Sequence, residues 1–584
     1  MDGKGVKRKK KSFTQKVMKF HKNGVNGKGF RLDDESFEYF LHVLKIMNQD
    51  FESDEEKRNF VHNVFEQLRG HEVEYSCNQV ISRIVDTLLP LTSDEVIFNF
   101  MGAFDTELRI TIMDPFASHV IEKLIVTCLE RYQTSSSEKS NNNAISSEKF
   151  SEWLLKVAKF SFNNFEEFIS DNYANHVLRT ILCCIVGETE DSITKSSSND
   201  QKILPSEFSS VLKNFVDQLT HWSHLLELPF DNLSSGFLQT LIRSTARVSS
   251  KRTKVLIKLF IDKCFARESE NVETDENEKQ DFSSVPSVFD VNSCVRLLEV
   301  VISVAPPKLF TQIYTRCFKN RLSVIACQST SNFAVQKLIQ HCQEKEEFES
   351  IFDEITSSID TIISNKRTGV ILQLCEACVR HKTKQAVFMQ VWMQYLGCNE
   401  SKESQNLLCP LTVFMKRKTE YNADEENTVT LHGSLLMQHM LKFNKPIKII
   451  SSLLEMNGNQ IASLFCDQKG SHIANAFFDS EYVGEKSREK LFKVLQNSFA
   501  SLALSKHGSR VFDILWGAAS VKNRTLIATE LLEQEAKLSA SPYGRPIIFT
   551  LSLNTFRHKR DEWIKAQTTS EKAKKIFADI LTKS

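Results

Sequence analysis

Glycine and proline are scarce in this sequence of 584 residues, which contains 18 glycines and 11 prolines. Turn-rich all-β folds need more of both residues, so the scarcity favours long runs of helix. No run of about 18 consecutive apolar residues occurs, so no membrane-spanning helix is expected. The N-terminus lacks the apolar stretch of a secretory signal, and the 14 cysteines are not densely paired, so we expect reduced intracellular thiols.

Motifs that carry known chemistry are also missing. The sequence contains no phosphate-binding loop of the G-x-x-x-x-G-K-[ST] type, no G-x-S-x-G, no H-E-x-x-H and no EF-hand loop. Cys375 and Cys378 form a C-x-x-C, but they lie in an apolar helical run, and no second pair stands near them to complete a zinc site. We therefore expect no enzyme, no cofactor and no metal, with both cysteines packed as small apolar side chains.

The net charge of +1 conceals an uneven distribution of charge along the chain. Residues 1–31 contain eleven Lys or Arg residues and one acid, which leaves 63 basic and 72 acidic residues in the rest of the chain. A basic cluster in this tail consists of Lys7, Arg8, Lys9, Lys10 and Lys11. Such a cluster is typical of nuclear or nucleolar targeting or of a nucleic-acid arm, and a solvated tail is the alternative. We expect residues 1–31 to be disordered and assign the cluster to targeting.

Two amphipathic helices are predicted after the tail. The first covers Asp33–Met47 and the second covers Asp54–Leu68, each with apolar residues on one face. Asp33 and Ser53 are the expected N-caps, because a short polar side chain before a helix satisfies its unpaired N–H groups. Residues 32–70 are therefore expected to cap the N-terminal end of the fold.

The most informative feature is an internal repeat. Eleven segments align without gaps, each with a turn-forming stretch followed by a helical pattern. They are Asn78–Leu89, Asp114–Ile125, Asp171–Leu182, Asn232–Arg243, Asp290–Val301, Gln328–Ile339, Ser364–Cys375, Thr430–Leu441, Asp467–Phe478, Ser505–Trp516 and Ser541–Ser552. We number positions from the fifth residue of each segment, which is position 0. Positions +2, +3, +6 and +7 are apolar in most segments, as expected for the buried stripe of a helix.

Position 0 recurs at 36 to 38 residues in six of the ten intervals, and the other four intervals are longer, at 57 to 66 residues. The long intervals contain polar insertions, which we expect to form solvated surface loops. These insertions lie near residues 133–149, 187–203, 268–287 and 397–430.

A second helix is expected to fill each repeat, for example at Asp94–Phe104 or Phe348–Ile363. One repeat of this size cannot bury its apolar stripe alone, so the repeats must stack on one another. The sequence therefore predicts an all-α superhelical solenoid of about eleven repeats over residues 71–560. A C-terminal helix is expected over residues 561–584.

Positions 0, +1 and +4 lie on a different face of each helix from the apolar stripe. This pattern resembles the helical Pumilio, or PUF, repeat. The resemblance implies Pumilio-like repeats in a C- or U-shaped solenoid. It also implies that positions 0 and +4 contact the edge of an RNA base and that position +1 stacks between neighbouring bases.

Seven segments carry residues that match this arrangement. The candidate RNA-binding residues are Ser82, Arg83, Asp86, Ser118, His119, Glu122, Asn175, His176, Arg179, Asn332, Phe333, Gln336, Ser434, Gln438, Ser471, His472, Asn475, Ser509, Arg510 and Asp513. Asn332 and Gln336 resemble the family's uracil-type pair, with Phe333 as the stacking residue. Glu122 belongs to a guanine-type set, because a carboxylate can accept from the N–H groups of guanine. Leu435, at position +1 beside Ser434, is a poor stacking residue.

Four segments depart from the pattern. Their residues at positions 0, +1 and +4 are Gly236, Phe237 and Thr240; Cys294, Val295 and Leu298; Thr368, Gly369 and Leu372; and Arg545, Pro546 and Phe549. Phe237 is expected to keep the stacking role, and Arg545 is expected to bind a phosphate at a terminal cap. The matching sets therefore cluster toward the two ends of the repeat region. For any single set, a solvated groove without RNA is the alternative.

The segments, the insertions, the basic tail and the entry helices together resemble a narrower family, the nucleolar Pumilio-like ribosome-biogenesis proteins typified by nucleolar protein nine. The resemblance covers about residues 33–560. It implies a protein of the nucleolus that binds precursor rRNA of the small ribosomal subunit through the concave face of the repeats. It also implies a role in processing and assembly, with proteins of the pre-ribosomal particle as partners. We expect a monomer without membrane association.

Two other functions are consistent with parts of the sequence. A protein-binding scaffold of the armadillo or HEAT type has repeats of about 40–47 residues, longer than most intervals here. Such a scaffold has no need for a flat or cationic residue at position +1. A cytoplasmic PUF-type regulator of messenger RNA has no need for the basic cluster at residues 7–11. The protein's location and the RNA crosslinked to it distinguish these functions.

Overall fold

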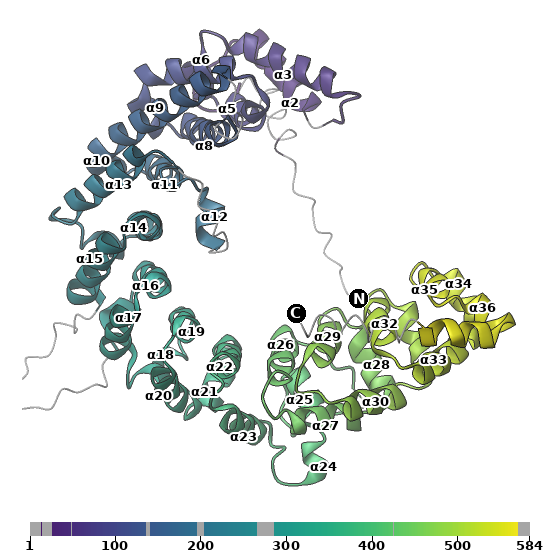
Figure 1. The fold of residues 1–584 in the computed structure, drawn as a ribbon. Helices are drawn as coiled ribbons and strands as arrows, with labels where there is room; N and C mark the ends of the chain where they lie inside the picture. The colour runs from purple at the N-terminus through teal and green to yellow at the C-terminus, as the bar shows by residue number, and fades with distance from the viewer. Residues whose placement is uncertain are drawn as a thin grey trace, which may run out of the picture. The chain divides into compact units, whose positions relative to one another are not determined.

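The computed structural model describes residues 13, 26–47, 49–135, 141–195, 204–265, 285–423 and 425–569. These residues form helices joined by short connections, with one isolated β-bridge between Gly29 and Asn78 (Figure 1). The predicted all-α class is therefore confirmed. The chain divides into two compact units, Met1–Cys317 and Phe318–Ser584.

The two predicted entry helices are present in the first unit. They are α2 (Asp34–Ile46) and α3 (Asp54–Leu68). The Asp33 carboxylate accepts a hydrogen bond from the Ser36 N–H at 2.8 Å, and the Ser53 hydroxyl oxygen accepts one from the Glu56 N–H at 3.2 Å. Both predicted N-caps are therefore confirmed.

The segment 26–32 packs against the first repeat, so the expectation of disorder up to residue 31 is wrong for residues 26–31. The Phe30 N–H donates to the Cys77 carbonyl at 3.0 Å, next to the bridge between Gly29 and Asn78. Gly29 has a φ of +89°, and a Cβ there would lie 2.0 Å from the Cys77 carbonyl oxygen. Only glycine fits this close approach. The basic cluster at residues 7–11 lies outside the described residues.

In the first unit, each of the five aligned segments forms a helix, called here a repeat helix. These are α5 (Gln79–Leu88), α8 (Ala117–Ser135), α11 (Ala174–Cys184), α14 (Asn232–Val248) and α16 (Asn292–Val304). Partner helices pack behind them: α6 (Asp94–Thr106), α9 (Asn141–Asn163), α13 (Ser206–Leu219), α15 (Ser250–Phe260) and α17 (Pro307–Ile313). Short elements complete the unit: α4 (Glu72–Ser76), η1 (Leu89–Leu91), α7 (Leu108–Met113), α10 (Phe165–Phe168), α12 (Glu190–Lys195), η2 (Leu228–Phe230), η3 (Ile261–Phe265), η4 (Ser287–Phe289) and η5 (Tyr314–Phe318).

The second unit repeats this organisation. Its repeat helices are α19 (Asn332–His341), α22 (Thr368–Arg380), α26 (Leu431–Met440), α29 (Ser471–Asp479), α32 (Gly508–Ala518) and α35 (Gly544–Leu551). Its partner helices are α20 (Lys345–Thr356), α23 (Gln385–Leu396), α27 (Ile447–Glu455), α30 (Glu485–Val494) and α33 (Val521–Glu533). Short elements are α18 (Leu322–Ile325), α21 (Ile359–Ser364), α24 (Lys402–Gln405), α25 (Leu408–Phe414), α28 (Gly458–Cys466), α31 (Phe499–Leu504), α34 (Glu535–Ala540) and α36 (Leu553–His558), followed by a helix over residues 560–569.

Each unit has two layers with an apolar core between them. In the first unit, consecutive repeat helices contact one another from α5 to α16, and in the second unit the same holds from α19 to α32. The apolar stripe points into this core: Val120, Ile121, Leu124 and Ile125 are each at most 1% exposed. This stacking is that of a helical solenoid, as predicted. The number of repeats and the C- or U-shaped outline stay predictions.

Two details of the polar and partner segments differ from expectation. The insertion near 397–430 is not a solvated loop throughout, because its helix α25 is buried and the Thr412 hydroxyl accepts a 2.9 Å hydrogen bond from the Trp392 indole N–H. The helix predicted over Phe348–Ile363 is interrupted at Ser357–Ser358, so that α20 and α21 replace it. Among the described residues, no helix has both the length and the apolar character needed to cross a membrane.

Candidate nucleic-acid interface

The three positions of each matching set differ systematically in exposure. Position 0 is at most 9% exposed in six sets, namely Ser82, Ser118, Asn175, Asn332, Ser434 and Ser471. Position +1 is exposed in six sets, namely Arg83, His119, His176, Phe333, His472 and Arg510. Position +4 is half-buried or exposed in all seven. The +1 and +4 side chains of the repeat helices thus form a solvent-facing surface in each unit, which we call the repeat-helix face.

Short polar side chains fix where each repeat helix begins. Asp114 accepts hydrogen bonds from the N–H groups of Phe116 and Ala117 at 2.7 and 2.8 Å. Asp171 and Asp467 likewise accept hydrogen bonds from the N–H groups of the residues two and three positions after them in the chain. Each aspartate satisfies N–H groups that have no partner within the helix, so the helix starts at a defined residue. Positions 0, +1 and +4 are consequently held at equivalent places in these repeats.

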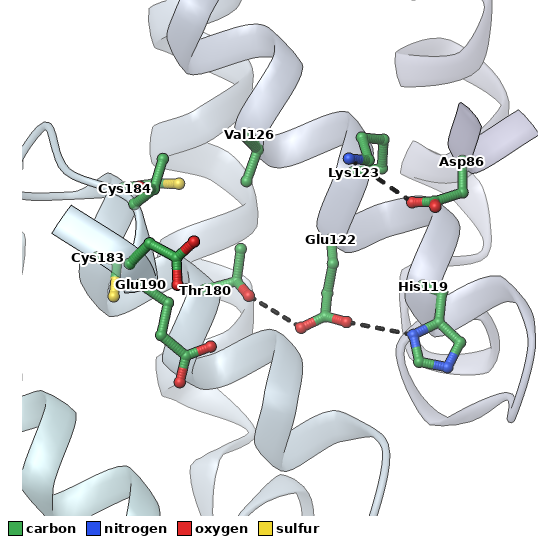
Figure 2. Close-up of a pocket in the computed structure, with 11 residues that line it drawn as sticks. Asp86, His119, Glu122, Lys123, Val126, Thr180, Cys183, Cys184 and Glu190 are labelled. Carbon is green, nitrogen blue, oxygen red and sulfur yellow. Dashed lines mark hydrogen bonds and ion pairs between the residues drawn. The ribbon is translucent and has the colours of Figure 1, made fainter. Parts of the chain in front are cut away.

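One pocket, of about 350 Å³, is lined by residues of the first two matching sets and of the third repeat helix (Figure 2). Glu122 at its centre lies 3.5 Å from His119 Nδ1 and accepts a 2.9 Å hydrogen bond from the Thr180 hydroxyl. The hydrogen bond that the His119 ring donates to the Glu122 carboxylate raises the pKa of His119, although partial burial of the ring opposes this. Lys123 lies 3.8 Å from Asp86 on the neighbouring helix. The pocket thus presents carboxylate acceptors beside a flat ring, which suits the N–H edge and the face of a base.

In the sixth repeat an amide pair occupies the repeat-helix face. The Asn332 amide nitrogen donates to the carbonyls of Gln328 and Ser329 at 2.9 and 2.8 Å, and its oxygen accepts from Gln336 Nε2 at 2.9 Å. A Cβ added to Gly369 of the next helix would lie 2.8 Å from Gln336 Oε1, so the glycine leaves room for this side chain. Phe333, beside the pair, is 55% exposed. The pair is held in place while the ring remains available for stacking.

The fourth repeat carries the same chemistry one residue earlier than predicted. Phe237 is fully buried, so its expected stacking role is wrong. Ser235 is also buried, donates to the Ser293 carbonyl at 2.7 Å and accepts from Gln239 Nε2 at 3.3 Å. In the eighth repeat Ser434 and Gln438 make the equivalent contacts. The Ser434 hydroxyl donates to the Lys469 carbonyl at 2.7 Å and accepts from Gln438 Nε2 at 3.1 Å.

The fifth repeat is likewise shifted by one residue, but in the opposite direction. Cys294, Val295 and Leu298 are all buried, whereas Arg296 is exposed and Glu299 is half-buried. Positions 0, +1 and +4 are therefore Val295, Arg296 and Glu299. These residues were not predicted, because the surrounding run of apolar residues fits a helical stripe in two registers.

In the third repeat, polar groups at positions 0 and +4 lack complete hydrogen bonding. Asn175 is buried and its amide nitrogen donates to the Ile169 carbonyl at 2.9 Å. Within the described part of the chain, neither Asn175 Oδ1 nor Arg179 Nε has a hydrogen-bond partner. Arg179 is ion-paired with Glu190 of α12, and its burial lowers the pKa of its guanidinium. The matching residues of the third repeat therefore meet a segment that belongs to an insertion.

The remaining sets vary. The guanidinium carbon of Arg83 in the first repeat lies 4.4 Å from the centre of the Phe13 ring. In the tenth repeat, burial raises the pKa of the Asp513 carboxyl. Leu372 of the seventh repeat is buried, as expected for a position that cannot contact a base. Phe549 of the last repeat is 85% exposed, and this exposed ring was not singled out from the sequence. Within the described residues, no three His, Cys, Asp or Glu side chains gather as a metal site would require.

Comparisons with known proteins agree with this geometry. The model of the NOP9-like PUF repeat domain family matches residues 70–546. Nucleolar protein 9 of Homo sapiens is 25% identical to this chain, over 94% of this chain and 91% of its own length. Pumilio homolog 23 of Arabidopsis thaliana is 24% identical, over 92% of this chain and 74% of its own length. The human relative and several others carry the name Nucleolar protein 9. These names confirm the nucleolar location expected from the sequence.

Solved structures with the same fold are also known. One named "Structure of APUM23-GGAGUUGACGG" matches with a TM-score of 0.71 at 22% sequence identity, covering 92% of this chain and 99% of that chain. A second, "Structure of APUM23-GGAAUUGACGG", matches with a TM-score of 0.70. This likeness confirms the helical-repeat solenoid.

Proposed function

Because this chain belongs to the NOP9-like PUF repeat family, we propose that it binds precursor rRNA of the small ribosomal subunit through the repeat-helix face of both units. Residues 71–560 form the RNA-binding repeat region, between entry helices over 32–70 and the C-terminal segment 561–584, of which residues 561–569 are helical and the rest lie outside the described residues. The protein acts in the nucleolus as a monomer, assists RNA processing and assembly, and has proteins of the pre-ribosomal particle as partners. It binds RNA without catalysing a reaction.

The observation that carries this proposal is the recurrence of one polar arrangement in repeats far apart in the sequence. Gln239, Gln336 and Gln438 stand at position +4, and each donates to the polar side chain at position 0 of its own helix. An amide held in this way keeps its carbonyl oxygen oriented, and such groups can hydrogen-bond the edge of an unpaired base. A solvated surface has no requirement for this repetition.

The exposed +1 residues supply the second requirement, a surface for stacking. Imidazole, guanidinium and phenyl groups all stack on base faces, and the exposed +1 residues are of these three kinds. Base stacking tolerates different sequences, whereas the +4 contacts distinguish one base from another. The fourth and fifth repeats join this surface through Gln239, Arg296 and Glu299, so the proposed interface includes the central repeats.

Binding by the amide pair is tested with Asn332→Ala combined with Gln336→Ala. The double variant is expected to weaken RNA binding by about 1–3 kcal/mol, because the base loses its hydrogen bonds to the Gln336 amide, which Asn332 orients. The probe is fluorescein-labelled GGAGUUGACGG, the sequence in the name of the solved APUM23 structure, alongside a pool of random single-stranded RNA. Gln340→Ala, on an exposed position of the same helix, is the matched control.

Anisotropy titration measures the dissociation constant, and circular dichroism checks the helical content of each variant. An unchanged affinity in a folded double variant contradicts the role of this pair. Absence of binding by the wild-type protein to both RNA probes contradicts RNA binding as a whole. Crosslinking in cells with sequencing of bound RNA tests the biological target. Enrichment on messenger RNA instead of small-subunit precursor RNA contradicts the proposed substrate.

A further inference from the structure

The segment 187–195, after α11, folds back over the repeat-helix face of the first unit. It contains α12, which contacts both α11 and α14. Figure 1 shows α12 on the side of α11 opposite to α13. We call residues 187–195 the acidic strap, because it contains Glu188, Glu190 and Asp191 against a single lysine. Its polar composition predicts a solvated insertion, which the structure corrects for these residues.

The acidic strap is anchored at several points. Gln133 of α8 donates to the Gly187 carbonyl at 2.9 Å, and Arg247 of α14 lies 3.1 Å from the Glu188 carboxylate. Ile193 is buried, with 4% of its surface exposed. The strap is therefore a folded part of this unit that touches three successive repeat helices, α8, α11 and α14.

The central contact joins the strap to a residue of the proposed interface. Glu190 forms an ion pair with Arg179, which stands at position +4 of the third repeat. The guanidinium donors that face Glu190 are those that would bind a base edge or a phosphate. Arg179 Nε, however, is buried and has no hydrogen-bond partner among the described residues. The ion pair with Glu190 thus leaves the Arg179 Nε–H without a hydrogen-bond acceptor among the described residues.

The charge around this contact also opposes RNA. The pocket of Figure 2 has acidic residues from two sources, the strap and the repeat helices. Its charged lining residues are Asp86, Glu122, Glu190 and Asp191 on the acidic side and Lys123 and His119 on the basic side. RNA carries one negative charge per nucleotide, so the strap carboxylates repel a backbone that approaches the third repeat.

We propose that the acidic strap is an internal competitor of RNA at the third repeat, where Glu190 holds Arg179 until an RNA group displaces it. This inference rests on the proposed RNA-binding function. RNA can replace the strap because Arg179 and Glu190 are 24% and 45% exposed, and ion pairs with this exposure are weak. An RNA group that also reaches Arg179 Nε gains a hydrogen bond that the strap does not provide. The strap therefore selects for RNA that engages the third repeat fully.

The test compares the wild-type chain with Glu190→Gln, using the labelled RNA GGAGUUGACGG and the random single-stranded pool. Removing the carboxylate is expected to tighten RNA binding by about two- to fivefold, the range of a weak exposed ion pair. In an Arg179→Gln background the same change is expected to have a clearly smaller effect, because the partner of Glu190 is gone and only its repulsion of RNA remains. Asp217→Asn is the matched control: it removes one carboxylate from an ion pair with Arg252 that joins α13 and α15.

Hydrogen exchange provides a second readout on the full chain. RNA is expected to speed amide exchange in residues 187–195 of the wild-type protein, because the strap is released. Unchanged or weaker RNA binding by Glu190→Gln overturns the inference and leaves RNA binding intact. An equal gain in RNA affinity in the Arg179→Gln background also overturns it, because the Glu190 carboxylate then acts only by repelling RNA and does not compete for Arg179. Failure of every protein, including the wild type, to bind either RNA overturns the proposed function and this inference together.

Discussion

At the scale of single residues, the environment of a side chain decides whether it serves the fold or the surface. Phe333 and Phe237 are chemically identical and both lie within the first two turns of a repeat helix. Phe333 is 55% exposed, whereas Phe237 is fully buried. Phe237 also packs in an aromatic group, with its ring centre 5.1 Å from that of Phe165. The two rings therefore differ in function as well as in exposure.

Replacing each ring by alanine separates these functions. Phe333→Ala is expected to weaken RNA binding by about 1–3 kcal/mol, because one base loses its stacking partner. Its free energy of unfolding should change by less than about 0.5 kcal/mol, since the ring lies at the surface. Phe237→Ala is expected to lower the free energy of unfolding by about 3–5 kcal/mol through the cavity it leaves.

RNA titration and urea unfolding of both variants check this prediction. Each variant is the control for the other, since both remove one phenyl ring from a repeat helix. A loss of stability in Phe333→Ala, or unchanged RNA binding by that variant in its folded state, would contradict the assignment of Phe333 to the surface for RNA.

At the scale of single helices, a shift of one residue changes which side chains face RNA. In α14 the structure places Gln239 on the repeat-helix face and buries Thr240, whose hydroxyl donates to the Gly236 carbonyl at 3.2 Å. Gln239→Ala is expected to weaken RNA binding by about 1 kcal/mol, because a hydrogen bond to a base is lost. Thr240→Ala should leave RNA binding unchanged. Anisotropy titration of the two variants distinguishes the registers, and the opposite order of effects would restore the register read from the sequence.

Helices with strong local signals were predictable from the sequence. The second entry helix was predicted with its observed bounds, Asp54–Leu68, because Ser53 caps its start and its apolar residues follow a helical period. The eleven aligned segments all form helices, because their apolar residues also follow a helical period. The local sequence is sufficient to predict a helix where the N-cap residue and the periodic apolar residues indicate the same segment.

Registers and long-range contacts were not predictable in the same way. In α16 the apolar residues run together, so only packing against neighbouring helices decides between Val295 and Arg296 at position +1. The buried helix α25 lies in a segment whose mixed polar composition predicts a loop. The strap contact between Glu190 and Arg179 joins two charged residues that could each have faced solvent. These features depend on tertiary contacts that no local pattern encodes.

At the scale of the whole molecule, the boundary between the basic tail and the folded chain becomes important. Residues 26–32 belong to the folded chain, since they pack on the first repeat. Asn78 holds this segment by donating to the Asn26 and Phe30 carbonyls at 3.1 and 2.9 Å, while its oxygen caps α5. Leu32 adds a buried apolar side chain, with 5% of its surface exposed. One side chain thus joins the segment after the tail to the start of the first repeat helix.

Two truncations test the targeting role of the tail separately from this structural role. Removal of residues 1–25 deletes the basic cluster and is expected to abolish nucleolar accumulation, with thermal unfolding unchanged. Removal of residues 1–32 is expected also to lower the free energy of unfolding by about 2–4 kcal/mol, because the buried leucine and the hydrogen bonds to Asn78 are lost. Fluorescence microscopy and thermal unfolding provide the two measurements.

The matched control for targeting is a full-length protein in which Lys16, Lys19 and Lys22 are replaced by glutamine. This variant lowers the charge of the tail but keeps the five consecutive basic residues at positions 7–11. If the cluster is the targeting signal, this variant stays nucleolar, whereas the protein lacking residues 1–25 does not. Nucleolar accumulation of the protein lacking residues 1–25 would contradict the targeting role and would mean that the repeats themselves retain the protein, through the RNA they bind.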